Sequence, residues 1–313
     1  MADVVSSRGV PRTSVVEDQP AAVRSWNPSD RLIALLFVLP TLVLIALLYV
    51  FPLSWNVYFS FTNFSAVKPP APVWVGIDNY VSILRNENIW FSFVTTATYV
   101  LAAVGVECLL GFGIAMLLNR RFSGAGLITT LLLLPMMVSP ALAAAFWGRK
   151  FFHPQGGLFN YYFIQLGMTP PDWLGNPRMA MLSLILVDIW QWTPFMLLLS
   201  LAGLSAVPRY LYEAAEVDQA SGWFKFREIT LPTVWPLMVI ALIFRSMDAV
   251  RVFEQQWVTS GYNQTTPTIA TAVYGLAFRN WDTGLASALA CIILVLTLAM
   301  TSMWVRFLSR IRS

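Results

Sequence analysis

Six apolar runs, each close to the length that crosses a lipid bilayer, dominate this chain of 313 residues. A helix needs about 20 mainly apolar residues to span the hydrocarbon core. The sequence predicts such spans at residues 32–53, 93–118, 127–147, 179–204, 234–253 and 285–307. Charged residues make up 12% of the chain, whereas soluble domains average about 25%. We therefore predict an all-α integral membrane protein with six transmembrane helices.

The basic residues predict which loops face the cytoplasm, because cytoplasmic loops carry an excess of Lys and Arg. In a six-span arrangement the richer face holds Arg8, Arg12, Arg24, Arg31, Arg120, Arg121, Arg209, Lys225, Arg227, Arg306, Arg310 and Arg312. The other face holds Lys68, Arg85, Arg149, Lys150, Arg178, Arg251 and Arg279 on longer loops. We expect both termini and the loop at 205–232 to be cytoplasmic. The net charge of +4 follows from this asymmetry and gives no indication of nucleic-acid binding.

The chain reads as a short tail followed by one membrane domain. Residues 1–30 are rich in Ser, Pro and Val without periodicity, which predicts a disordered cytoplasmic tail. Residues 31–313 are predicted to form the transmembrane domain, and the first span is a retained helix rather than a cleaved signal peptide. Pro135 and Pro140 predict a kink in the third span. Residues 54–92, 148–178 and 254–284 are expected as outer loops.

A polar, helix-prone segment at 205–232 interrupts the apolar pattern between the fourth and fifth spans. Pro208 precedes a predicted amphipathic helix from Arg209 to Gln219. Ser221 is a candidate N-cap for a second helix, since Ser side chains accept hydrogen bonds from the first free amides. Two short helices at an angle would form a knob that can insert between subunits.

This segment resembles the EAA loop of ABC-transporter permeases, the helical element that docks into a groove on the ATPase subunit. The resemblance implies that the loop transmits nucleotide-driven closure to the spans. It assigns ATPase coupling to Glu213, Ala214, Ala215, Asp218, Gly222, Leu231 and Pro232.

The family usually has glycine where this chain has Gln219. Glycine adopts a left-handed conformation at little cost, whereas other residues are strained there. Either Gln219 stays helical and the turn moves to Ser221 and Gly222, or the corner is strained. We favour the shifted turn.

Further motifs resemble those of carbohydrate-type permeases, and their order resembles the first permease subunit of a MalF-like sugar importer. They are Phe37–Pro40, Tyr49–Leu53, Ser60–Phe64, Trp74–Tyr80, Leu134-Pro135 with Ser139-Pro140, and Arg245-x-x-Asp248-x-x-Arg251-x-Phe253. The resemblance implies the type I ABC importer permease (MetI-like) fold in the bacterial cytoplasmic (inner) membrane. It implies a second homologous permease, an ABC ATPase dimer, an extracytoplasmic solute-binding protein and a sugar or glycoside substrate. The chain would then be no enzyme and hold no cofactor, since ATP and Mg would bind the partner ATPase.

Polar residues at membrane depth are costly and usually face a cavity or a partner. The fourth span carries such residues at i, i+3, i+4 and i+7, and the fifth at i, i+3 and i+6, so each set shares one helix face. Matching positions line the substrate cavity in MalF-like permeases, which makes Asp188, Gln191, Trp192, Phe195, Arg245, Asp248 and Arg251 the candidate cavity residues. Arg245 and Asp248 could instead neutralise each other or bond to the partner permease. Glu107 is interpreted as a structural hydrogen-bonding residue, and Gly111-Phe112-Gly113 as a site of close helix packing.

Other functions find less support in the sequence. His153 is the single histidine, so neither a His-based zinc site nor a His-based triad is available, and no phosphate-binding Gly-x-x-x-x-Gly-Lys-Ser/Thr loop is present. One alternative is an ABC importer for an anionic polar solute, such as a glycerol-phosphate or sulfonated glycoside. Another is a secondary transporter driven by an ion gradient, although the inverted repeats typical of that class are not evident.

Overall fold

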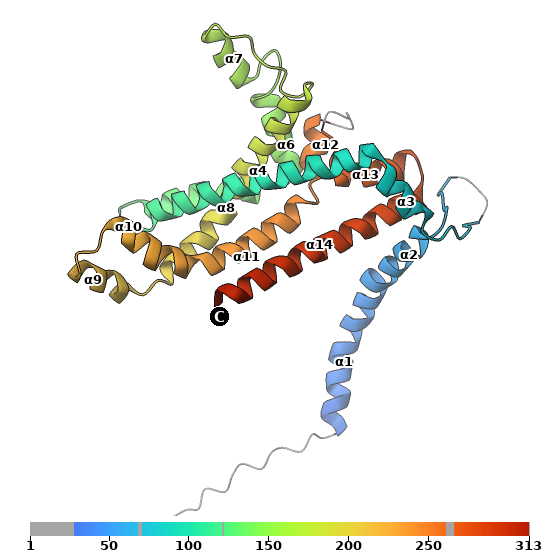
Figure 1. The fold of residues 1–313 in the computed structure, drawn as a ribbon, viewed down its shortest axis with the longest axis horizontal. Coiled ribbons are helices and arrows are strands. Elements are labelled where there is room, and N and C mark those ends of the chain that lie inside the picture. Colours follow the sequence, from blue (N-terminus) through green and yellow to red (C-terminus); the bar gives the residue numbers. More distant parts are fainter. Residues whose placement is uncertain (1–27, 68–70, 121, 261–265, 313) are drawn as a thin grey trace, which may run out of the picture. The chain divides into compact units, whose positions relative to one another are not determined.

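The computed structural model describes residues 28–67, 71–120, 122–260 and 266–312 (Figure 1). Nearly all regular structure in these segments is helical, and the β pairing among them is an isolated bridge between Thr62 and Trp74. The tail predicted at 1–30 lies outside the described residues up to position 27. The predicted all-α architecture is confirmed for the described part of the chain.

The chain divides after Leu53 into two units. The described part of the first is helix: α1 (Pro28–Ile45), a π turn (Ala46–Val50) and the beginning of α2 (Phe51–Ser60). Together they form an apolar helix from Leu35 to Ser60, long enough to cross a membrane.

Four long helices form the frame of the second unit: α4 (Glu87–Leu118), α8 (Pro177–Ser205), α11 (Leu231–Ala249) and α14 (Thr283–Arg312). α8 packs against α4 and α11, and α11 also packs against α4 and α14. Asn86 caps α4 and Asn176 caps α8, because each side chain accepts hydrogen bonds from two free amides of the first turn. The Asn86 cap explains why α4 begins before the predicted position 93, at residues too polar to read as a span.

The third span is broken rather than gently kinked. α5 (Ala125–Leu133) continues as a 3₁₀ turn (Leu134–Met137), and α6 (Pro140–Lys150) then departs at 97°. Ser139 is extended because it precedes Pro140, and its hydroxyl accepts from the Leu142 amide to start α6. The predicted kink is confirmed, and the described residues contain five single-helix spans, or six if this bent pair counts as one.

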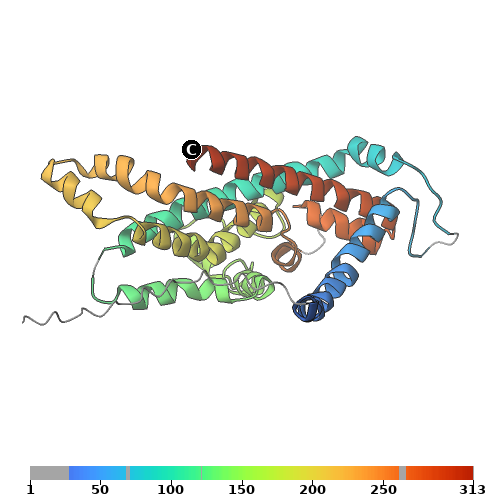
Figure 2. The ribbon, with the colours of Figure 1, turned by 90° about the horizontal axis from the view of Figure 1, so that it is seen from below.

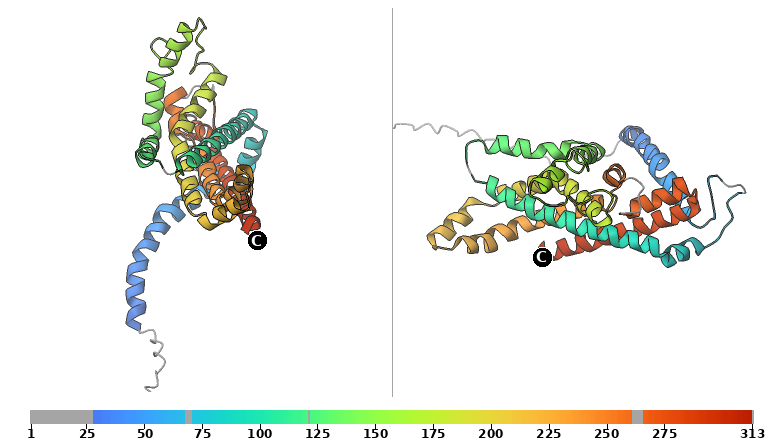
Figure 3. Two further views of the ribbon diagram at one scale, coloured as in Figure 1. Left: turned by 90° about the vertical axis from the view of Figure 1, so that its left-hand side faces the viewer. Right: turned by 90° about the horizontal axis from the view of Figure 1, so that it is seen from above.

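The segments expected as outer loops also contain helices: α3 (Asp78–Arg85), α7 (Leu158–Gln165), α12 (Glu254–Ser260), α13 (Ile269–Tyr274) and a π turn (Gly275–Arg279). α12 packs against α6 and α8 (Figure 3). Gln256 is buried there and hydrogen-bonds the Thr266 carbonyl and the Thr268 hydroxyl. The stretch at 254–284 is therefore partly interior, which its polar sequence does not suggest.

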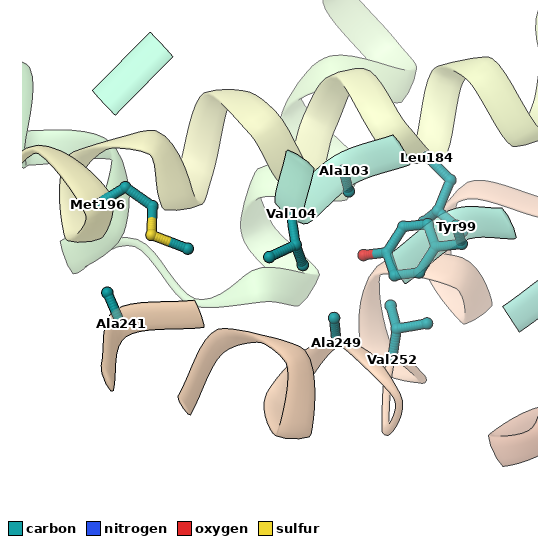
Figure 4. Packing of buried hydrophobic residues seen from close by; sticks show 8 residues of the cluster. All are labelled: Tyr99, Ala103, Val104, Leu184, Met196, Ala241, Ala249 and Val252. Atoms are coloured by element: carbon teal, nitrogen blue, oxygen red, sulfur yellow. The ribbon is translucent and has the colours of Figure 1, made fainter. Parts of the chain in front are cut away.

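The core between α4, α8 and α11 combines small side chains with a few large ones, among them Tyr99 (Figure 4). It contains Tyr99, Ala103, Val104, Leu184, Met196, Ala241, Ala249 and Val252. Close approach continues beyond this cluster at Gly111, where an added Cβ would lie 2.5 Å from the Met196 Cβ and 2.8 Å from the Leu197 backbone nitrogen. The close helix packing predicted for Gly111 is confirmed.

Gly111→Ala should destabilise the chain by about 1–3 kcal/mol, because the new methyl group meets backbone as well as side chain. The thermal midpoint of the purified, detergent-solubilised protein measures this change. Gly113→Ala is the matched control, since nothing lies within 4 Å of a Cβ at Gly113 and alanine favours the helix. Equal midpoints for the two variants would contradict the close contact.

Candidate functional site

The segment that resembles the EAA loop folds as two helices that meet at a corner. α9 (Arg209–Val217) is followed by α10 (Gly222–Phe224), a π turn (Lys225–Thr230) and α11. The Ser221 hydroxyl accepts a hydrogen bond from the Phe224 amide at 3.2 Å, so the predicted N-cap is confirmed. From Gly222 to Ala249 the chain is one unbroken helix. The second half of the loop is therefore continuous with the span that carries Arg245.

Of the two alternatives for Gln219, the favoured shifted turn is wrong, and the strained corner is what the structure contains. α9 ends at Val217, and Gln219 itself takes a left-handed conformation with φ of 52°. Its amide donates to the Glu216 carbonyl at 3.1 Å, and the Ala220 amide donates to the Ala215 carbonyl at 2.9 Å. These two bonds form a Schellman motif, whose left-handed position glycine usually fills. The satisfied carbonyl groups offset the strain at Gln219 and keep the turn in place.

Gln219→Gly should stabilise the chain by about 1 kcal/mol, because glycine removes the strain of the left-handed conformation. The thermal midpoint of the purified protein is again the measurement. Asp218→Gly is the control: its φ of −76° is ordinary for any residue, so glycine there only adds freedom to the unfolded chain. A Gln219→Gly protein that is no more stable than Asp218→Gly would show that the left-handed conformation of Gln219 carries no strain.

The predicted coupling residues divide by exposure. Ala215 is buried, Leu231 is half-buried, and Glu213, Ala214, Asp218, Gly222 and Pro232 are exposed. Two contacts hold α9 against the following helix: Lys225 Nζ to Glu216 Oε1 at 3.2 Å, and the Tyr212 and Thr230 hydroxyls at 2.8 Å. The outer face also exposes large apolar side chains, at Tyr210, Val217, Trp223 and Phe224. This exposed, partly apolar corner is suited to contact another protein.

The α9–α10 corner lies at one end of the four-helix frame (Figures 1 and 2). α4, α8 and α14 run toward that end, and α11 runs away from it. The C-terminal end of α14 is thus on the same side of the frame as the predicted coupling loop.

Inside the frame, Arg245 is the centre of an ionic network that joins three helices. Its Nε donates to Glu107 Oε2 of α4 at 2.8 Å, and its Nη2 donates to Glu107 Oε1 at 3.1 Å. Nη2 also donates to Asp188 of α8, and Nη1 donates to Asp248 Oδ2 at 3.3 Å. The guanidinium lies over the Trp192 ring, 5.1 Å from its centroid. Arg245, Glu107 and Asp188 are each at most 2% exposed, whereas the Asp248 side chain is 52% exposed.

This network bears on two sequence predictions. Glu107 forms buried hydrogen bonds, which confirms its interpretation as a structural residue. Arg245 and Asp248 do pair, as the structural alternative supposed, although Asp248 also remains open to the cavity. The sequence reasoning missed that Glu107 is the partner of Arg245. The sequence did contain a signal for this pairing, because an acidic residue and a basic residue lie on two predicted spans. Charges at membrane depth rarely stay unpaired.

Gln191 lies behind the cavity wall and is 1% exposed. Its amide nitrogen donates to the Val138 carbonyl at 2.7 Å, and its oxygen accepts from Gln255 Nε2 at 2.7 Å. Val138 is the residue at the break between α5 and α6. Gln191 therefore ties α8 and α12 to the broken span, a role that Gln255 shares and that the sequence did not reveal.

The other candidate residues meet around two hollows that share a wall. The first, of about 240 Å³, is lined by Asp188, Trp192, Arg245, Asp248, Arg251 and Glu254, among others. The second, of about 450 Å³, is more apolar and is lined by Trp192, Phe195, Leu199, Ile240, Phe244, Arg245, Asp248 and Arg251. The structure thus brings six of the seven candidate cavity residues to one place, with Gln191 supporting them from behind. Aromatic faces stand beside carboxylate and guanidinium groups, which suits a solute with both apolar and hydroxyl-bearing surfaces.

Comparison with known proteins gives consistent results. The trehalose/maltose transport system permease protein MalF of Thermococcus litoralis is 34% identical over 272 residues, covering 87% of this chain and 92% of that protein. The sulfoquinovosyl glycerol transport system permease protein SmoG of Agrobacterium fabrum is 33% identical over 304 residues, covering 95% and 98%. Both alignments run through nearly the whole chain.

A solved structure shares the fold. It is a bacterial ABC transporter involved in the import of the acidic polysaccharide alginate, and one of its chains superposes with a TM-score of 0.79 at 23% identity. The match covers 91% of this chain and 97% of that one. The importer-permease fold that the resemblance to carbohydrate-type permeases implied is confirmed.

The model of the family described as "Binding-protein-dependent transport system inner membrane component" matches residues 107–313. That range contains the ionic network, the α9–α10 corner and the spans from α8 to α14. It favours binding-protein-dependent transport over the gradient-driven alternative. With its several membrane-spanning helices, the chain belongs to the family of inner membrane components of binding-protein-dependent transport systems.

Proposed function

We propose that this chain is the first permease subunit of an ATP-driven importer that carries a sugar or glycoside across the cytoplasmic membrane. The family is the membrane-spanning, non-catalytic component of such systems and has no cofactor of its own. The substrate class is supported by relatives named for trehalose and maltose and for sulfoquinovosyl glycerol. The observation that carries the proposal is the cavity in which Trp192 and Phe195 stand beside Asp248 and Arg251. A sugar ring offers C–H surface to the aromatic faces and hydroxyl groups to the charged ones.

The complete transporter would contain three further kinds of protein. A second, homologous permease would complete the pathway, an ABC ATPase dimer would bind ATP and Mg, and an extracytoplasmic binding protein would deliver the solute. The long helix Leu35–Ser60 would lie in the bilayer, because it is long and apolar enough to cross a membrane. Both termini and the tail at 1–30 would face the cytoplasm, together with the α9–α10 corner.

The α9–α10 corner would dock onto the ATPase and couple its closure to the membrane helices. Glu213, Ala214, Asp218, Gly222 and Pro232 are exposed and would form the docking surface. The buried Ala215 and the half-buried Leu231 would anchor that surface to the frame. Closure of the ATPase dimer would displace the corner, and the continuous helix Gly222–Ala249 would pass the displacement to the cavity wall.

Within the cavity the candidate residues would have two roles. Trp192, Phe195, Asp248 and Arg251 would contact the solute, since they line the hollows. Asp188, Gln191 and Arg245 would fix the shape of the wall, because their side chains are almost fully buried in hydrogen bonds within the chain. Transport changes no covalent bond in the solute, so these groups need only bind, orient and release it.

ATP-dependent uptake into proteoliposomes tests the proposal. The vesicles would hold this chain co-purified with its second permease, ATPase and binding protein, and a panel of radiolabelled glycosides would be offered with and without ATP. Uptake of at least one glycoside that requires ATP is the expected result. Uptake that proceeds equally without ATP would contradict the proposal and return the gradient-driven transporter to consideration.

A further inference from the structure

The charges around the cavity between α8 and α11 do not balance. Among the described residues that line the first hollow, three side chains are acidic, Asp188, Asp248 and Glu254, and two are basic, Arg245 and Arg251. The second hollow adds no further ionisable lining residue within the described chain. The wall supplied by this chain is therefore formally negative.

Arg245 is not available to an anionic solute. A guanidinium has five N–H donors and no acceptor, and each of its three nitrogens here already donates to a carboxylate of the chain. The side chain is 2% exposed, and one face of the guanidinium is turned to the Trp192 ring. The carboxylates of the network that holds the three helices together neutralise its positive charge.

Among the described residues that line the hollows, Arg251 is the exposed arginine. Acidic residues close to it in the sequence weaken its attraction for an anionic solute. Asp248 lies three residues before it and Glu254 three residues after it, and both are exposed and line the same hollow. An anion that approaches Arg251 also approaches these two carboxylates. Charges in a confined cavity are screened much less than charges at an open surface, so this repulsion is not removed by salt.

A hydroxyl group faces no such conflict. It can accept a hydrogen bond from Arg251 and donate one to Asp248 or Glu254, and bonds to ionised groups are stronger than bonds between neutral ones. Trp192 and Phe195 supply the adjacent apolar surface for the C–H face of a ring. The lining is thus complementary to a polyhydroxylated solute without a charge.

We propose that this cavity selects an electrically neutral glycoside and excludes one that carries a carboxylate, sulfonate or phosphate. This inference rests on the proposed function, because it describes the same cavity as a sugar pathway. The cavity would thereby favour a neutral sugar over the anionic glycosides that the sequence keeps as an alternative.

The test is equilibrium binding to the purified complex of this chain with its partner permease and ATPase, measured without the binding protein. Omitting that protein ensures that the selectivity belongs to the membrane cavity. The probes are maltose and the analogue in which one 6-hydroxymethyl group is oxidised to a carboxylate. Maltose should bind at least tenfold more tightly than the carboxylate analogue.

Glu254→Gln should reduce this preference severalfold, because it removes one negative charge and keeps the size of the side chain. Glu87→Gln is the matched control, since Glu87 is likewise an exposed glutamate in the first turn of a helix, but lines neither hollow. Asp248→Asn is a second variant with the same expected direction, in case Glu254→Gln fails to assemble.

Tighter or equal binding of the carboxylate analogue would overturn the inference. So would an unchanged preference in both Glu254→Gln and Asp248→Asn. These outcomes differ from a failure of the proposed function: a complex that takes up no glycoside with ATP contradicts that function, whereas ATP-driven uptake that prefers the anionic member of the panel contradicts the neutral selectivity alone.

Discussion

Arg245→Met should severely destabilise the folded chain. The substitution keeps the approximate length of the side chain but removes the guanidinium. It leaves Glu107 and Asp188 buried beside each other with no cation between them. Removing one partner of a buried ionic cluster costs about 3–5 kcal/mol, because the remaining charge is neither solvated nor paired. Size-exclusion chromatography of the detergent-extracted complex and its thermal midpoint should both report the loss, as aggregation and as a lowered midpoint.

Arg251→Met is the matched control for Arg245→Met, since Arg251 is exposed and forms no ion pair with another described residue. It should leave the midpoint nearly unchanged. Arg245→Lys should give an intermediate result, because lysine supplies the charge without the planar fork that reaches three carboxylates. Combining Arg245→Met with Glu107→Gln and Asp188→Asn should recover part of the stability. A midpoint for Arg245→Met equal to that of Arg251→Met would show that the network does not hold the helices together.

Glu213→Lys should strongly reduce ATP-driven uptake while leaving the chain folded. Glu213 is exposed on α9, and its side chain makes no hydrogen bond or ion pair with another described residue, so reversing its charge disturbs nothing inside the chain. Truncating one partner of a charged contact between proteins costs about 2–5 kcal/mol, and reversing a charge adds repulsion. We expect uptake into proteoliposomes to fall at least tenfold, with an unchanged thermal midpoint of the permease.

Glu87→Lys provides the control for Glu213→Lys, because it reverses another exposed glutamate in the first turn of α4, far along the chain from the corner. Its uptake should match that of the unmodified transporter. Glu213→Gln should fall between the two. Full ATP-dependent uptake in the Glu213→Lys protein would contradict the proposed role of α9 in coupling to the ATPase.

The features that could be predicted were those set by strong local rules. The apolar runs located the long helices, because lipid requires every backbone amide to be bonded within the helix. Pro140 marked the break in the third span, since proline constrains the residue before it. Ser221 marked the start of the second loop helix for a similarly local reason.

The features that were missed depend on contacts between distant parts of the chain. Gln219 takes the left-handed conformation because carbonyl groups of the preceding turn are satisfied there, which outweighs its own preference. Gln191 looks like a cavity residue by helix spacing, yet its amide is needed at Val138, in the third predicted span. Gln255 and Gln256 are polar and were placed in a loop, although their hydrogen bonds allow them to be buried. Sequence spacing shows which residues share a face, but not which partner occupies that face.

The close glycine contacts of α8 limit how this chain can move. Gly111 of α4 touches α8 at Met196, and Gly203 of α8 touches α11, where an added Cβ would lie 2.8 Å from Val234 Cγ1. Arg245 fastens the same three helices at another level. Packed protein interiors change between discrete arrangements and do not deform continuously. We therefore expect α4, α8 and α11, which contact one another at several positions along their length, to move as one rigid body. In the proposed transporter, alternation between outward and inward openings would then arise at the boundary between this body and its neighbours, and a ligand bound at that boundary would stop transport without touching the solute cavity.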